Sequence, residues 1–307
     1  MISNGKFYES QFEEATIELL REAHWQYAFG DDIHRKYTDP LIEEDLRNFL
    51  TVQYKDKNLT TSEMDSIVAN LRNTGGQNDY YALRNAFLLY RDGYDFAYSD
   101  GRDNPFRLEY IDFEHPDHNI FRCVNQFVME QGRENRRPDI LLFINGIPVC
   151  IIELKNPTKQ NATIHDAHTQ ICTRYMRDIP ALLKYCALAV ISDGAKNALG
   201  TTYTPFEFFY EWKKIENEDK AGKGLDTLRT LIRGALSPER ILEILRDYVY
   251  FPDPTKEDDT TEIVCRYPQF FATRKLRDHI LNHLRSVGGD GKGGTYFGAT
   301  GCGKTYT

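Results

Sequence analysis

Three charged residues near the middle of the chain have the types and the spacing of a metal-dependent hydrolytic site. Asp139 opens one apolar run, and Glu153 and Lys155 close the next one. Two carboxylates and an amine at the end of buried strands are costly to desolvate unless they bind something. A divalent metal with an attacking water is the natural candidate. Glu153 and Lys155 lie two positions apart, so on a strand they project from one face.

The elements that must position these residues are predicted to be the two strands of a β-hairpin. Runs rich in Ile, Leu, Val and Phe flank Asn145-Gly146, which is the strongest short-range signal for such a hairpin. Neither run alternates cleanly with polar residues. This pattern is typical of central strands that are covered on both faces.

The parity of the hairpin decides whether the three charged residues can meet. With a plain two-residue turn, Asp139 would pair with Ile152, and Glu153 would point to the other face. Convergence therefore requires an odd number of loop residues or a bulge in one strand. We predict a three-residue loop in which Gly146 is left-handed and forms a G1 bulge. A two-residue turn without a bulge would break the site.

The chain resembles the PD-(D/E)xK nucleases at these residues, where Pro138-Asp139 is followed after thirteen residues by Glu153-Leu154-Lys155. The surrounding sequence is similar to the restriction (R) subunit of type I restriction–modification systems, along most of the chain. The segments that carry this resemblance are Ile111-Asp112-Phe113 with Asn119, Val124-Asn125-Gln126-Phe127, Arg136-Arg137-Pro138-Asp139 and Asn145-Gly146-Ile147-Pro148. The resemblance implies an α/β fold, with a restriction-endonuclease-like mixed sheet flanked by helices. It also implies a helical insertion and a truncated RecA-like segment at the C-terminus.

The resemblance also implies roles for the central residues. Asp139 and Glu153 would hold one or two Mg²⁺ ions, with the Leu154 carbonyl as a further ligand. Lys155 would orient the attacking water or stabilise the charge that develops in the transition state.

A further acidic residue is expected on the first helix. Residues 12–22 have helical apolar spacing, and the related nucleases open with a helix whose Glu reaches the metal site. Glu14 is our choice for this role, with Glu13 as a close competitor. The alternative is an amphipathic helix with its acids on the solvated face.

Gln170 is expected to join the site from a helix predicted over residues 163–184. R subunits carry a Gln-x-x-x-Tyr element on this helix, associated with the nuclease site. Here the tyrosine is Tyr175, five residues after Gln170. A regular α-helix would place it well round from Gln170, which leaves the role of Tyr175 open. The alternative for Gln170 is an exposed polar residue.

The composition along the chain suggests three parts. Residues 1–212 are predicted to form the endonuclease domain, with the helical insertion at about 31–105. Helices are expected in the insertion near 40–54, 61–74 and 79–92. Residues 213–224 are charged, contain glycine and lack an apolar period, which favours a linker. Residues 225–307 are predicted to be a helical connector and the start of the first RecA-like motor domain.

The last residues carry a second chemistry, because they match the P-loop pattern G-x-x-x-x-G-K-[ST] after a short β-like run at 294–297. The residues expected to bind ATP with Mg²⁺ are Gly298, Gly301, Gly303, Lys304 and Thr305. Backbone N–H groups would cradle the phosphates, Lys304 would neutralise the β/γ oxygens and Thr305 would ligate Mg²⁺. Upstream, Gln269 lies in a segment that resembles the adenine-reading element of superfamily 2 helicases, with helix capping as the alternative.

The P-loop pattern is followed by only two residues, Tyr306 and Thr307. We therefore expect a truncated chain, with the motor cut after its Walker A element and unable to hydrolyse ATP.

The composition excludes several classes of protein. A net charge of −8 argues against general coating of nucleic acid but permits a local basic cleft. No apolar run approaches the ~20 residues of a membrane span, and no signal peptide is evident, which favours a cytoplasmic protein without membrane contact. The six cysteines lack CxxC or Cys/His spacing, so we expect reduced thiols and no zinc site.

Two polar groups near the hairpin remain open between a functional and a solvated role. His115, Asp117 and His118 share a turn and could ligate a metal, although turn residues beside a proline are usually solvated. The other group is Arg133, Arg136 and Arg137, which could contact DNA phosphates or form a solvated basic turn.

The function favoured by the resemblance is Mg²⁺-dependent cleavage of double-stranded DNA, after ATP-driven translocation. The resemblance implies specificity and modification (methyltransferase) subunits as partners. One alternative is a nuclease-fold module that docks the motor to these partners and does not cut. The other is a P-loop ATPase fragment, which the missing motor motifs disfavour.

Overall fold

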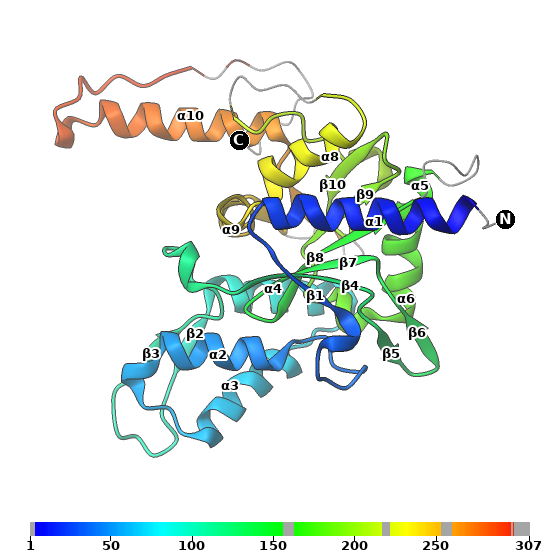
Figure 1. Cartoon of the computed structure of the whole chain (residues 1–307). Coiled ribbons are helices and arrows are strands. Elements are labelled where there is room, and N and C mark those ends of the chain that lie inside the picture. Colours follow the sequence, from blue (N-terminus) through cyan, green and yellow to red (C-terminus); the bar gives the residue numbers. More distant parts are fainter. Residues whose placement is uncertain (1–3, 156–162, 217–221, 253–259, 296, 298–307) are drawn as a thin grey trace.

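A six-stranded mixed sheet lies at the centre of the protein (Figure 1). The computed structural model describes residues 4–155, 163–216, 222–252, 260–295 and 297. The sheet has the order β1-β4-β7-β8-β9-β10. Its strands are β1 (Gln26–Phe29), β4 (Phe121–Asn125), β7 (Ile140–Ile144), β8 (Ile147–Leu154), β9 (Leu188–Ser192) and β10 (Asn197–Gly200). The pairs β1–β4 and β8–β9 are parallel and the others are antiparallel, which confirms the predicted α/β class with a mixed sheet.

The turn between β7 and β8 corrects one prediction. Ile144 pairs with Ile147, so the loop holds only Asn145 and Gly146. Both have positive φ, 50° and 78°, as a type I′ turn requires. The predicted three-residue loop is therefore wrong.

Packing against the rest of the protein explains why the turn is so tight. The Gly146 carbonyl accepts a hydrogen bond from the Ile42 backbone N–H at 2.9 Å. A Cβ atom on Gly146 would lie 2.1 Å from the Ile42 carbonyl oxygen, so no side chain fits there. The fully buried Asn145 side chain accepts from the Ile120 N–H and donates to the Tyr110 carbonyl. The loop is thus fixed by neighbours that are distant in the sequence.

A bulge in β8 supplies the change of parity that the turn does not. The register between β7 and β8 shifts at Val149, which leaves one residue of β8 without a partner. Val149 and its neighbour Cys150 both belong to the same buried cluster, although successive strand residues normally face opposite sides. The requirement for a bulge or an odd loop is confirmed, but the bulge lies within the strand.

Helices pack on both faces of the sheet and bury an apolar cluster on each. Leu141, Phe143 and Ile151 face a helical run that contains a π-helical segment. This run consists of α5 (Ile164–Thr169), the π-helical η4 (Gln170–Tyr175), α6 (Met176–Asp178) and α7 (Pro180–Leu183). The single helix predicted over 163–184 is therefore divided into segments. The opposite face carries Ile140, Leu142 and the buried face of α1 (Asn4–Glu22).

The three helices predicted near 40–54, 61–74 and 79–92 are present, and a small antiparallel pair of strands follows them (Figure 1). Its elements are α2 (Glu43–Gln53), α3 (Thr61–Asn73), α4 (Asp79–Asp92), β2 (Tyr94–Phe96) and β3 (Phe106–Leu108). Thr60 caps α3 in a reciprocal arrangement with Glu63, each side chain accepting from the backbone N–H of the other.

Short 3₁₀ turns and one further hairpin connect the elements described so far. These are η1 (Gly30–Asp32), η2 (Lys55–Lys57), η3 (Pro116–His118), β5 (Met129–Gln131), β6 (Glu134–Arg136) and η5 (Phe206–Phe208).

The C-terminal helices share the core of the sheet. Trp25 donates from Nε1 to the Leu236 carbonyl at 2.7 Å, and Leu231 and Phe270 belong to the same buried cluster as Trp25. The elements are α8 (Leu225–Leu231), the π-helical η6 (Ile232–Leu236), α9 (Pro238–Asp247), β11 (Val249–Tyr250), β12 (Ile263–Val264), α10 (Tyr267–His283) and η7 (Arg285–Val287). The domain boundary predicted at 213–224 stays a prediction.

The structure bears only in part on the predicted motor segment. The β-like run expected at 294–297 forms no strand at positions 294, 295 and 297, the part of the run that is described. The P-loop residues Gly298, Gly301, Gly303, Lys304 and Thr305 lie outside the described residues. Among the helices that are described, none has the length and apolar character needed to cross a membrane.

Candidate active site

The open end of the β7–β8 hairpin brings Asp139 and Glu153 together. Ile140 pairs with Ile152, so the next positions outward are Asp139 and Glu153. The Leu154 backbone N–H donates to Asp139 Oδ2 at 2.7 Å, which ties the aspartate to the end of β8. The bulge in β8 thus provides the one-residue change of register that was predicted to come from the loop.

Glu153 is a buried carboxylate whose hydrogen bonding is incomplete. Its residue is 1% exposed, and Oε1 accepts a hydrogen bond from Lys155 Nζ at 2.8 Å. No described residue makes a hydrogen bond to Oε2, which is also buried. Burial raises the pKa of Glu153 to about 8, and the negative charge of Asp139 adds to this shift, while Lys155 and a hydrogen-bonding contact with Tyr175 oppose it. A buried oxygen in this state is suited to a cation ligand.

Lys155 and Gln170 meet at the same place, as predicted. Lys155 Nζ donates to Gln170 Oε1 at 3.2 Å, in addition to its bond to Glu153. The Lys155 side chain is 16% exposed, so its charge is held close to the carboxylate and largely out of water. The backbone N–H of Lys155 is anchored to the Ser192 carbonyl of β9 at 2.8 Å.

Tyr175 also reaches the site, because residues 170–175 form a π-helix. Gln170 Nε2 donates to the Tyr175 hydroxyl oxygen at 2.8 Å. In a π-helix the i→i+5 hydrogen bonds bring residues five apart onto one face, whereas an α-helix would separate them. The expectation that Tyr175 lies well round the helix from Gln170 is therefore wrong. The extra residue in this element relative to Gln-x-x-x-Tyr is accommodated by the local widening of the helix.

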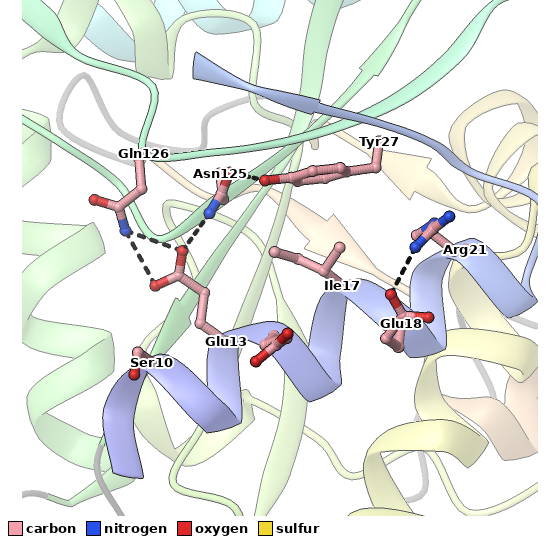
Figure 2. Close-up of a pocket in the computed structure, with 9 residues that line it drawn as sticks. Ser10, Glu13, Ile17, Glu18, Arg21, Tyr27, Asn125 and Gln126 are labelled. Carbon is pink, nitrogen blue, oxygen red and sulfur yellow. Dashed lines mark hydrogen bonds and ion pairs between the residues drawn. The ribbon is translucent and has the colours of Figure 1, made fainter. Parts of the chain in front are cut away.

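The two acids considered on α1 occupy different environments. Glu13 points to the end of β4, where Asn125 Nδ2 donates to it at 2.7 Å and Gln126 Nε2 donates to both of its oxygens at 3.0 Å (Figure 2). Glu14 is exposed. Both line a hollow of about 530 Å³ between α1 and the end of β4, together with Tyr27.

Gln126 links Glu13 to the segment that carries Asp139. Its backbone N–H donates to the Asp139 carbonyl at 3.3 Å, while its side chain holds the Glu13 carboxylate. Its φ of +55° is unusual for a non-glycine residue and turns the chain at the end of β4. From the sequence this segment contributed only to the family resemblance; the signal that could have identified Gln126 is the pair of amides, Asn125 and Gln126, at the end of an apolar strand. The geometry favours Glu13 over Glu14 as the acid of α1 that reaches the metal site, and the role of either stays a prediction.

The arginines beside the site divide into two kinds. Arg136 forms ion pairs with Asp178 and Glu134, with nitrogen–oxygen distances of 2.7 and 2.5 Å, so its charge is already neutralised within the fold. Arg133 and Arg137 are exposed, and neither has an ion pair within the described part of the chain. These two side chains are therefore free to meet phosphates.

Gln269 has a structural contact that bears on its predicted role. It is 6% exposed, and its Oε1 accepts from the Arg266 backbone N–H at 2.8 Å at the start of α10. This is the capping role that was considered beside adenine recognition. The adenine role stays a prediction.

Comparison with known proteins identifies the family of this chain. Residues 6–208 match the family model described as the type I restriction enzyme R protein N terminus. The chain belongs to this family. The match extends from α1 to η5 and includes the candidate site residues Glu13, Glu14, Asp139, Glu153, Lys155, Gln170 and Tyr175.

Individual relatives carry the same description. Over 97% of its length the chain is 28% identical to the type I restriction enzyme HindI endonuclease subunit of Haemophilus influenzae. Over 96% it is 27% identical to the putative type I restriction enzyme MjaIXP endonuclease subunit of Methanocaldococcus jannaschii. The alignments cover 29% and 30% of these two relatives, so the chain spans less than a third of their length. The resemblance to type I R subunits is confirmed.

Proposed function

We propose that this chain is the DNA-cleaving part of a type I restriction enzyme R subunit and that it requires Mg²⁺. The observation that carries the proposal is the unpartnered, buried Oε2 of Glu153, which lies beside Asp139 and Lys155 at one end of the sheet. Two carboxylates whose charges repel each other need a cation, and carboxylate and carbonyl oxygens are the ligands that Mg²⁺ prefers.

Asp139, Glu153 and the Leu154 carbonyl would hold Mg²⁺, and Glu13 or Glu14 of α1 would approach from the adjoining hollow. Bound Mg²⁺ would supply a water of lowered pKa and offset the charge of the phosphate group.

The chain's own side chains would complete the chemistry. Lys155 is fixed between Glu153 and Gln170, so its ammonium group can orient the attacking water or stabilise the developing negative charge. Tyr175 positions Gln170 and thereby Lys155. The exposed Arg133 and Arg137 would contact the phosphates of double-stranded DNA.

A further part of the proposal concerns ATP, translocation and partner subunits. We propose that residues 298–305 bind ATP with Mg²⁺ and that a motor beyond them drives translocation along DNA before cleavage. The P-loop pattern and the alignment to relatives more than three times as long support this. We also propose specificity and modification subunits as partners, because both relatives are named as subunits of type I restriction enzymes.

Nicking of supercoiled plasmid by the purified chain with Mg²⁺ or Mn²⁺ tests the proposal. We expect nicking that is lost in Asp139→Ala and Lys155→Ala and kept in Asp95→Ala, which removes a carboxylate of the insertion whose side chain is 76% exposed. If none of these proteins nicks, calorimetric metal titration decides. Binding abolished by Asp139→Ala supports a gated site, and the absence of any Mg²⁺ or Mn²⁺ binding refutes the nuclease proposal.

A further inference from the structure

A second group of metal-ligating side chains lies away from the candidate active site. Asp112, His115 and His118 each offer one ligand atom, and these atoms lie within 4.8 Å of one another. The group belongs to the loop that joins β3 to β4. Asn119 of this loop receives a hydrogen bond from Asn145, at the turn of the β7–β8 hairpin. Asp139 lies at the other end of β7, about 20 Å away at the usual rise of a strand.

The carboxylate of Asp112 is held in place without any metal. It is 5% exposed, and its Oδ1 accepts from the backbone N–H groups of Glu114 at 3.0 Å and His115 at 2.9 Å. Gln53 Nε2 donates to Oδ2 at 3.1 Å. Burial raises the pKa of Asp112, but the His115 backbone N–H, His118 and the other donors outweigh it and lower the pKa overall. The group is therefore a fixed anion at neutral pH.

Two imidazole rings converge on Oδ2 of this anion, the oxygen that Gln53 also reaches. His118 Nδ1 lies 2.9 Å and His115 Nδ1 lies 3.3 Å from the same oxygen, Oδ2 of Asp112. The rings are stacked, with centroids 4.7 Å apart and planes inclined by 23°. Tetrahedral Zn²⁺ sites, with bonds of about 2.0–2.1 Å, place neighbouring ligand atoms about 3.3 Å apart. The nitrogen-to-oxygen distances are already of this size.

We propose that Asp112, His115 and His118 form a second metal site, which binds a transition-metal dication of the Zn²⁺ class. Two imidazole nitrogens and one carboxylate oxygen favour such an ion over Mg²⁺, which prefers oxygen ligands. Each neutral imidazole can carry its proton on Nε2, so the ion would replace the two Nδ1 hydrogen bonds to Oδ2 without releasing a proton. Water completes the coordination, because the two histidine side chains are 63% and 48% exposed.

The site would have a structural role that is independent of DNA cleavage. The Asn119 side chain accepts from the Asp112 N–H at 2.9 Å and donates to the Asp112 carbonyl at 2.7 Å, in addition to its bond with Asn145. A metal at Asp112 would therefore fasten this loop, and through it the hairpin turn. The absence of CxxC and Cys/His spacing predicted no zinc site, and the candidate cluster in this turn was His115, Asp117 and His118, with Asp117 in place of Asp112.

Zn²⁺ titration calorimetry on the Asp139→Ala chain tests the proposal, because this background removes a proposed ligand of the active site. We expect binding of one equivalent of Zn²⁺ that excess Mg²⁺ does not displace and that His115→Ala/His118→Ala abolishes. The controls are Asp117→Ala, an acid of the same turn, and His34→Ala, an exposed imidazole elsewhere, and both should bind as the parent does. Gln53→Ala, which removes a donor behind the carboxylate, should weaken binding by roughly 10–100-fold.

Two further readouts separate a metal site from misfolding. Co²⁺ should give a visible absorption band in the Asp139→Ala chain and none in the double histidine variant. Zn²⁺ should raise the melting temperature of the Asp139→Ala chain, while the double variant should melt as the parent does in EDTA and show no response to Zn²⁺. Zn²⁺ binding that survives in the folded double variant, or no binding by the parent, would overturn the proposal.

Discussion

Glu153 and Asp112 are two carboxylates buried to nearly the same extent, 1% and 5% exposed, yet their surroundings act in opposite directions. Asp112 accepts hydrogen bonds from two backbone N–H groups and from Gln53, and its pKa is lowered. Glu153 has one oxygen on Lys155 and one that no described residue satisfies, and its pKa is raised to about 8. Burial alone therefore does not decide the charge of an acid.

The difference separates two ways of preparing a cation site. At Asp112 the loop supplies enough donors to keep the carboxylate ionised and oriented before any metal arrives. At Glu153 the protein leaves the charge under-compensated, next to the second negative charge of Asp139. Below a pH of about 8 a proton relieves this repulsion, and a strongly bound cation would relieve it by displacing the proton. The arrangement at Asp112 favours fold stability, whereas the arrangement at Glu153 lowers the stability of the metal-free protein once the carboxyl group ionises.

The largest expected effect is a pH-dependent destabilisation of the metal-free protein by Glu153. Because its folded pKa of about 8 exceeds the ordinary 4.5, its stabilising contribution is complete below pH 4.5 and is lost as the pH rises towards 8. We expect the free energy of unfolding of Glu153→Gln, relative to that of the parent, to rise by on the order of 4 kcal/mol between pH 5 and pH 8. Urea unfolding in EDTA measures this. Parallel pH profiles for the two proteins would contradict it.

For Asp112→Asn we expect an effect on stability of intermediate size, with the opposite dependence on pH. The lowered pKa means that Asp112 stabilises the fold above its ordinary pKa of 3.8 and that this contribution disappears as the pH falls through the lower folded value. The loss of charged hydrogen bonds should cost about 1.5–3 kcal/mol at neutral pH. The cost should not fall between pH 7 and pH 5, because any charging of the adjacent His115 and His118 strengthens their contact with the carboxylate, and it should shrink below pH 3.8. A cost that falls between pH 7 and pH 5 would remove the contrast with Glu153.

The smallest expected effect concerns Tyr175, which supports the Glu153 end through Gln170 and Lys155. Tyr175→Phe should cost about 1 kcal/mol of stability by removing one buried hydrogen bond. Nicking should slow by about tenfold, which corresponds to a similar free energy in the transition state.

Tyr185→Phe is the matched control for Tyr175→Phe. The Tyr185 hydroxyl is also buried and donates to the Leu71 carbonyl at 3.1 Å, on the other face of the sheet from the Glu153 network. It should lower stability by a similar amount and leave the nicking rate per folded molecule unchanged. Equal slowing in both variants would mean that Tyr175 acts only through stability.

The sequence was sufficient wherever local pattern and chemistry coincide. Asn145-Gly146 predicted the hairpin, because few residues other than these adopt positive φ at both turn positions. The apolar runs predicted central strands, and the spacing of Asp139, Glu153 and Lys155 predicted the site. Parity also showed that the hairpin must contain an irregularity, since the number of residues between the two acids does not suit a regular ladder.

The tertiary structure decided what depends on contacts between distant segments. The bulge lies at Val149 and not in the loop, because Gly146 is held against Ile42 and leaves no room for a third loop residue. Glu13, and not Glu14, meets Gln126, because the packing of α1 sets which face turns to β4.

Contacts between distant segments also decide which residues Tyr175 and Asp112 meet. The π-helix that returns Tyr175 to Gln170 is stabilised by packing on the sheet and has no signature in spacing alone. Asp112 joins His115 and His118 because the loop folds back through Asn119 and Gln53. The sequence by itself therefore indicated which residues are candidates for the chemistry, and packing between segments far apart in the sequence determined which of them meet.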